Sequence, residues 1–196
     1  KGLSPQILGH VTDDAKLNGA YSVTVAGTTA YVASQVSDSL TVIDVSNPAS
    51  PQILGHVTDA KLDGARSVTV AGTTAYVASS VSDSLTVIDV SNPASPQILG
   101  HVTDAKLNGA RSVTVAGTTA YVASYDSDSL TVIDVSEYAQ PVSDTPLVLN
   151  TPLFARGGIA AAQLTGTLDP ARIPGLDASK ITSGTFAGGM IADGSL

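Results

Sequence analysis

The chain has 196 residues and a formal net charge of −8, from 17 acidic and 9 basic side chains. This acidic balance argues against binding to nucleic acid or to anionic membranes. The absence of cysteine excludes disulfides, thiolate metal ligation and a cysteine nucleophile. With 43% hydrophobic residues the composition is that of a folded chain, and no apolar run is long enough for membrane insertion.

One unit of about 45 residues occurs three times. The decapeptide SPQILGHVTD begins at Ser4, Ser50 and Ser95, and residues 50–94 match residues 95–139 at 40 of 45 positions. The differences are Asp63/Asn108, Ser80/Tyr125, Val81/Asp126, Asn92/Glu137 and Pro93/Tyr138. Recent duplication and an engineered array would both produce such closeness.

Each unit predicts four short strands, which in the second unit span residues 51–57, 65–71, 74–78 and 85–90. Val68 and Val70 alternate with polar neighbours, and the strands are separated by Gly72-Thr73, by a Ser/Asp loop and by SNPASP. Period-two alternation, β-branched residues and regular turns favour strands over helix. We therefore expect an all-β chain of β-propeller-type units, each a four-stranded antiparallel blade.

Three segments make this pattern specific: AYVA at 75–78, LTVIDVSNP at 85–93 and PQILG at 96–100. Over residues 4–139 the chain resembles the LVIVD-repeat family of β-propellers. The resemblance implies that AxSVTV is the innermost strand of a blade and AYVA the second. It likewise implies that LTVIDV is the third strand and PQILGHV the outermost.

Three units are too few to close a propeller, which typically has four to eight blades. Residues 4–11 supply an outermost strand with no preceding inner strands, whereas the third unit continues as SEYAQPV after Val135, a weak substitute. The leftover first strand is expected to complete the last blade, within one chain or between chains, with six blades in a dimer or nine in a trimer. An uncapped array also favours polymerisation by strand addition. A further alternative is that the chain is part of a longer array.

The composition shifts after about residue 141, which divides the chain into a repeat region (1–141), a Pro/Gly-containing linker (142–162) and a tail (163–196). LTGTL at 164–168 returns as ITSGTF at 181–186, with DPARIPGLDASK between them. This tail resembles the ARIPxLDASKITSGTF repeats of phage tail fibres, although AGGM at 187–190 departs from the pattern. The resemblance implies a fibrous β/coil tail and a homotrimer.

Repeated polar residues are predicted to be structural, because every unit offers the same side chain and catalysis needs groups of different kinds. We expect His10, His56 and His101 at equivalent strand ends, and Asp44, Asp89 and Asp134 bonded to turns. We expect Lys16, Lys61 and Lys106, with Arg66 and Arg111, in the loops before the innermost strands, the lysines pairing with Asp13, Asp59 and Asp104. Asp126 and Asp128 alternate as in a fragment of a calcium loop but lack its glycine and glutamate.

No catalytic, cofactor-binding or metal-binding residue is predicted, and Tyr125, Asp126 and Tyr138 are the candidates for contact with a partner. The sequence favours a non-enzymatic structural or adhesive protein that self-associates, as a trimer or a strand-added filament. Its loops are expected to contact a cell-surface receptor or glycan, outside the cell, at its surface or on a virion. The alternative is an enzyme or small-ligand binder that uses the central channel of a closed propeller.

Overall fold

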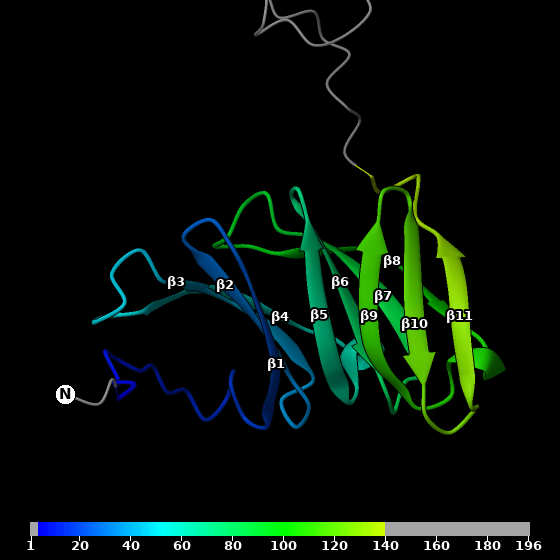
Figure 1. Cartoon of the computed structure of the whole chain (residues 1–196), viewed down its shortest axis with the longest axis horizontal. Coiled ribbons are helices and arrows are strands. Elements are labelled where there is room, and N and C mark those ends of the chain that lie inside the picture. The colour runs from blue at the N-terminus through cyan, green and yellow to red at the C-terminus, as the bar shows by residue number, and fades with distance from the viewer. Residues whose placement is uncertain (1–3, 140–196) are drawn as a thin grey trace, which may run out of the picture. The chain divides into compact units, whose positions relative to one another are not determined.

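The computed structural model describes residues 4–139, which form three antiparallel β-sheets in a row (Figure 1). The first sheet has the order β1 (Ala20–Ala26), β2 (Thr29–Ser34), β3 (Ser39–Asp44) and β4 (Gln52–Thr58). The second has the order β5 (Ala65–Ala71), β6 (Thr74–Ser79), β7 (Ser84–Asp89) and β8 (Gln97–Thr103). The third holds β9 (Ala110–Ala116), β10 (Thr119–Ser124) and β11 (Ser129–Asp134).

The predicted four-stranded blade is confirmed in the first two sheets, with strand bounds within one residue of those expected. Val68 pairs with Val77 and Tyr76 with Val87, so consecutive strands align side by side as hairpins. Gly72, with φ of 61°, makes the tight turn between the first two strands of the second sheet, a conformation that glycine adopts without steric cost.

Two short 3-10 helices connect the sheets, η1 (Ala60–Leu62) after β4 and η2 (Ala105–Leu107) after β8. The Asp59 carboxylate begins η1 by accepting a hydrogen bond from the Lys61 backbone N–H at 2.9 Å. The Lys61 carbonyl in turn accepts hydroxyl hydrogen bonds from Ser84 at 2.9 Å and Thr86 at 2.8 Å. Each connecting loop is therefore fastened to the third strand of the sheet that it enters.

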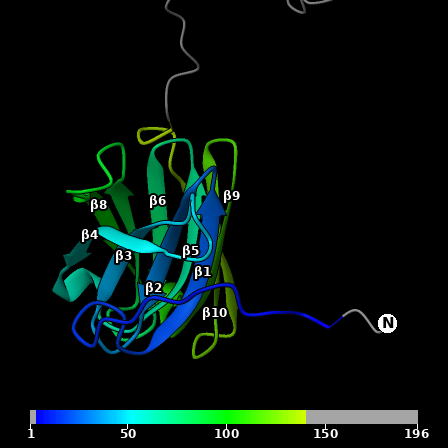
Figure 2. The same cartoon turned by 90° about the vertical axis from the view of Figure 1, so that its left-hand side faces the viewer.

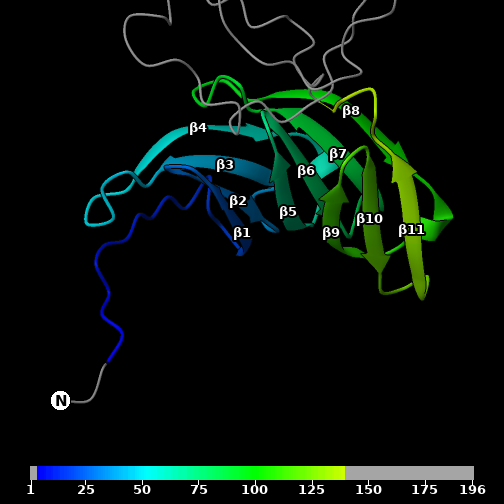
Figure 3. The same ribbon diagram turned by 45° about the horizontal axis from the view of Figure 1, so that its top comes forward.

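The first strands of the sheets, β1, β5 and β9, lie side by side (Figures 1 and 3). The Val68 N–H donates to Ser22 Oγ at 3.3 Å, and the Val113 N–H donates to Ser67 Oγ at 3.1 Å. Apolar side chains fill the space between neighbouring sheets and form one core at each junction. The sheets thus pack as propeller-type blades that are not closed into a ring.

The third sheet has three strands among the described residues, which end at residue 139, before the stretch that corresponds to β8. Residues 4–12 form no strand, although they repeat the β4 sequence. Arg66 and Arg111 lie within β5 and β9, so the prediction that placed them in loops was wrong. The linker and the fibre-like tail predicted for residues 142–196 lie outside the described residues.

Candidate functional site

The outer side of the third sheet exposes apolar residues that are buried elsewhere in the repeat. Leu130 is 67% exposed, whereas its counterparts Leu40 and Leu85 are fully buried. Val132 is 60% exposed, and its counterpart Val87 only 4%. In the first two sheets the residues at these positions pack against the next sheet. The same apolar residues are exposed to solvent on the third sheet. We call this surface the C-terminal open face, made of Tyr121, Ala123, Leu130 and Val132.

The first sheet, which faces the viewer in Figure 2, exposes the complementary residues at the other end of the row. Val23 is 63% exposed, whereas Val68 and Val113 are 6% and 7% exposed. The same contrast separates the exposed Ala20 from its counterparts in β5 and β9, which are fully buried. We call this surface the N-terminal open face, made of Leu17, Ala20, Val23 and Val25.

Gly9, in the segment 4–12 that repeats the β4 sequence, lies against the first sheet as Gly55 of β4 lies against the second. A Cβ atom at Gly9 would lie 2.5 Å from the Pro48 carbonyl oxygen, and one at Gly55 would lie 2.5 Å from the Pro93 carbonyl oxygen. Ile7 and Leu8, by contrast, are 92% and 68% exposed. The segment is thus positioned as an outermost strand but lacks a sheet to complete.

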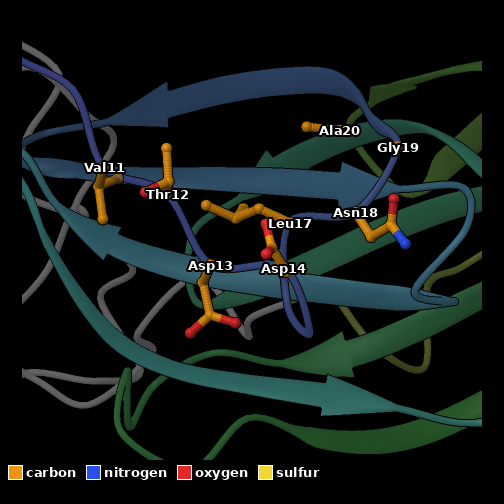
Figure 4. A pocket seen from close by; sticks show the side chains of 8 residues that line it. All are labelled: Val11, Thr12, Asp13, Asp14, Leu17, Asn18, Gly19 and Ala20. Carbon is orange, nitrogen blue, oxygen red and sulfur yellow. The ribbon is translucent and has the colours of Figure 1, made fainter.

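A pocket of about 320 Å³ opens at the N-terminal open face (Figure 4). Its lining comes from two short stretches, residues 11–14 and 17–20. At the matching place in the second sheet, the Gly64 N–H donates to Asp38 Oδ1 of the first sheet at 3.0 Å. In the third sheet the Gly109 N–H donates to Asp83 Oδ1 at 2.9 Å. The pocket is therefore the place that an aspartate of the preceding sheet fills at the two internal junctions.

Of the three residues predicted to contact a partner, two lie in one loop and the third, Tyr138, lies apart from them. Tyr125 and Asp126 lie in the β10–β11 loop, where Tyr125 is 67% exposed and its ring stacks 4.2 Å from Arg111 Cζ. The Asp126 carboxylate lies directly over Gly109. Tyr138 follows β11, at the end of that strand opposite to the β10–β11 loop, and its hydroxyl packs against Gly100. Tyr138 contacts the core between the second and third sheets, whereas Tyr125 remains available on the surface.

The repeated aspartates bond to turns, as predicted. Asp44, Asp89 and Asp134 accept hydrogen bonds from the backbone N–H two residues later, at 2.8, 2.8 and 2.9 Å. These bonds favour the charged carboxylate and hold the pKa of each of the three below its ordinary value.

The repeated lysines pair with aspartates, which confirms the predicted pairing. The ion pairs Lys16–Asp13, Lys61–Asp59 and Lys106–Asp104 span 2.6, 3.0 and 3.1 Å. His56 and His101 lie within β4 and β8, opposite Thr41 and Thr86, rather than at the strand ends that were expected. All three histidines are exposed.

One carboxyl departs from this pattern. Burial and the neighbouring Asp38 carboxylate raise the pKa of Asp63. The equivalent positions in the other two units are Asn18 and Asn108, which carry no charge. The junction between the first and second sheets therefore contains a carboxyl pair that the next junction lacks.

Within residues 4–139 no group of three or more His, Asp or Glu side chains is placed to hold a metal ion. That same part of the chain has no helix long and apolar enough to cross a membrane.

The hydrogen bond that the Gly64 N–H donates to Asp38, and its repeat from the Gly109 N–H to Asp83, were not predicted from the sequence. A signal was present, because an aspartate precedes a glycine by 26 residues in both cases. These aspartates, with Asp128, also adopt positive φ angles of 47° to 49°, which sequence does not show.

Antiparallel sheets that pack through their first strands give residues 4–139 a β-propeller-like fold of blades that are not closed into a ring. The LVIVD repeat model matches residues 19–59, 64–104 and 109–144, more than half of the chain, and the chain belongs to this family. No curated protein matches the sequence.

Solved structures share the fold. Hydrazine synthase of Kuenenia stuttgartiensis superimposes with a TM-score of 0.53 at 24% identity, over 65% of this chain and 35% of that one. A functionally unknown protein from Desulfotomaculum acetoxidans has a TM-score of 0.53 at 18% identity, over 62% of this chain and 41% of its own. The chain thus spans less than half the length of either structure.

Proposed function

We propose that this chain is a non-enzymatic structural repeat protein that associates with copies of itself. One observation carries the proposal: the C-terminal and N-terminal open faces are copies of two surfaces that pack against each other twice within the chain. Bringing Leu130 of one copy against Val23 of the next repeats the internal packing of Leu40 and Leu85. Burying such apolar surface is the main driving force for protein association.

The two open faces differ from each other, so association is head to tail. A head-to-tail contact produces a ring if the rotation closes and a filament if it does not. Each copy adds three blades, so two copies give a ring of six and three copies a ring of nine. A ring of six blades lies within the range of four to eight blades that is typical of propellers.

Strand addition supports the same arrangement. β3 and β4 pair with Thr41 opposite His56 and Val42 opposite Gly55, and β7 and β8 pair in the same register. Transferred to β11 and residues 6–12 of a second copy, this register places Thr131 opposite His10 and Val132 opposite Gly9. The incoming strand adds a fourth strand to the third sheet and covers the edge of β11, which has no partner strand within residues 4–139.

The exposed loops supply the adhesive part of the proposal. Tyr125 presents an aromatic ring stacked on Arg111, and such flat rings are common in contacts with proteins and sugars. A ring or filament displays this loop once per copy, so weak contacts with a surface receptor or glycan add up. This display suits a protein at a cell or virion surface.

The test is sedimentation velocity of the full chain across nanomolar to micromolar concentration. We expect species of two or more copies, and expect Leu130→Asp to shift the population to monomer. Val81→Asp is the matched control, because Val81 is 60% exposed and the third unit carries Asp126 at the equivalent position. A wild-type chain that stays monomeric at micromolar concentration overturns the proposal.

A further inference from the structure

We infer that the pocket at the N-terminal open face is a binding site for Asp128, the last residue of the β10–β11 loop, of a second copy. In this site the Asp128 carboxylate accepts a hydrogen bond from the Gly19 N–H. The inference rests on the proposed self-association and names the polar contact that aligns the two copies.

Two internal junctions already contain this contact. Asp38 accepts from the Gly64 N–H at 3.0 Å, and Asp83 accepts from the Gly109 N–H at 2.9 Å. Both glycines are buried and both aspartates half-buried, so each hydrogen bond is shielded from water. A charged acceptor makes such a bond stronger than one between neutral groups.

Asp128 and Gly19 are the two residues at these repeat positions that do not take part in an internal aspartate–glycine hydrogen bond. Within residues 4–139 neither the Asp128 carboxylate nor the Gly19 N–H has a hydrogen-bond partner. Both residues are exposed, unlike their counterparts. Asp128 nevertheless has the same backbone conformation, with φ of 48° against 47° for Asp38 and 49° for Asp83. Its side chain is thus preorganised for a partner that the described part of the chain does not provide.

The residues around the pocket suit an incoming carboxylate. Asn18 stands where Asp63 stands at the first junction, so Asp128 meets an amide and not a second carboxyl. Two carboxyl groups also line the pocket: Asp13 is neutralised by Lys16 at 2.6 Å, and Asp14 is exposed, so that solvent and salt screen its charge. Val11 and Leu17 provide apolar walls, which strengthen a hydrogen bond by excluding water (Figure 4).

Two substitutions of Asp128 separate the carboxylate from the backbone. Asp128→Gly keeps the positive φ accessible and removes the acceptor, so we expect it to weaken self-association about tenfold or more, measured by sedimentation. Asp128→Asn keeps an acceptor oxygen and tolerates the same φ, so we expect a smaller loss. Glu137→Gln, with the same change in charge as Asp128→Asn, is expected to leave association unchanged. Equal affinity of Asp128→Gly and the wild type overturns the inference.

Cysteine cross-linking tests the geometry directly, because the natural chain has no cysteine. The pair Asp83→Cys and Asn108→Cys reports the internal junction and is expected to form a disulfide within one chain. The equivalent pair Asp128→Cys and Asn18→Cys is expected to form a disulfide between chains under the same oxidation. If only the internal pair cross-links while sedimentation still shows oligomers, the inference fails and the proposed function stands. If sedimentation shows monomer alone, the proposed function fails as well.

Discussion

The Asp83 carboxylate accepts a hydrogen bond from the Gly109 N–H at 2.9 Å and thereby joins the β6–β7 loop to the entrance of the third sheet. Asp38 and Gly64 form the same bond one junction earlier, at 3.0 Å. Each junction thus combines an apolar face with a polar contact at its edge. The apolar residues and the aspartate–glycine pair recur at fixed positions in the repeat. Each end of the row of sheets therefore exposes one apolar face and one residue of the pair, Gly19 at the first sheet and Asp128 at the third.

Leucine truncation distinguishes internal junctions from the open end. Leu85→Ala leaves a cavity in a filled core and is expected to lower the free energy of unfolding by about 3 kcal/mol. Leu130→Ala removes a side chain that is 67% exposed, so the stability of the monomer is expected to change by less than about 0.5 kcal/mol. Urea unfolding, carried out at a protein concentration too low for association, measures the free energy of unfolding of both variants. Equal losses in the two variants would show that the third sheet is covered.

The close approach at Gly55 predicts a second difference. A Cβ atom there would lie 2.5 Å from the Pro93 carbonyl oxygen, so Gly55→Ala is expected to lower stability by about 2 kcal/mol. Gly9→Ala meets the Pro48 carbonyl in the same way, but residues 4–12 complete no sheet in the single chain. We expect it to leave the unfolding midpoint unchanged and to weaken association. A lower midpoint for Gly9→Ala would contradict this reading.

Tyr138 and Tyr125 are expected to separate a packing role from a surface role. Tyr138 packs on Gly100 beside the second core, so Tyr138→Ala is expected to lower the free energy of unfolding by about 2 kcal/mol. Tyr125→Ala changes an exposed side chain and is expected to change it by less than about 0.5 kcal/mol. Thermal unfolding of the two variants checks the contrast. A large decrease in the stability of Tyr125→Ala would show that the Tyr125 ring packs against the folded chain.

Much of the fold was predictable from sequence because each strand sequence occurs at least twice in the chain. The strands around Val68 and Val70 alternate with period two and end at glycine or proline turns, so local pattern and tertiary packing agree. The weak outer strand predicted after Val135, where SEYAQP replaces SNPASP, falls largely outside the described residues and stays a prediction. The family match over residues 19–144 confirmed the LVIVD resemblance, whereas nothing in the described residues tests the fibre-like tail.

The junction contacts were harder to predict because they depend on distances that sequence does not contain. The positive φ of Asp38 and its reach to Gly64 arise from how two sheets pack, not from either segment alone. Arg66 was expected in the loop before the innermost strand, yet it lies in β5 with its guanidinium 4.9 Å from the ring of Tyr21, a contact that depends on how the first two sheets pack. Tyr138 was predicted to contact a partner, and its packing against Gly100 depends on a distance between strands that the sequence does not contain.

The carboxyl pair at the first junction predicts a pH-dependent stability difference. The pKa of Asp63 is raised in the folded protein, so its contribution to stability is present at low pH and lost as the pH rises above 3.8 and through the folded value. Asp63→Asn is therefore expected to stabilise the chain at pH 7 by about 0.5 kcal/mol. This gain should vanish below pH 3.8, the ordinary value for aspartate. Chemical unfolding at several pH values measures it.

The third unit provides the reverse substitution as a control. Asn108→Asp creates the same carboxyl pair beside Asp83 and is expected to destabilise the chain at pH 7 by a similar amount. A pH-independent effect of either substitution would mean that the carboxyl pair is not its cause.

The mass of the full chain in solution tests the central claim most directly. One chain has a mass of 19.6 kDa. At micromolar concentration we expect native mass spectrometry to show at least twice that mass, in whole multiples of one chain, and expect Leu130→Asp to return it to a single chain. A wild-type chain found only at 19.6 kDa would show that the two open faces do not meet, and would contradict the account.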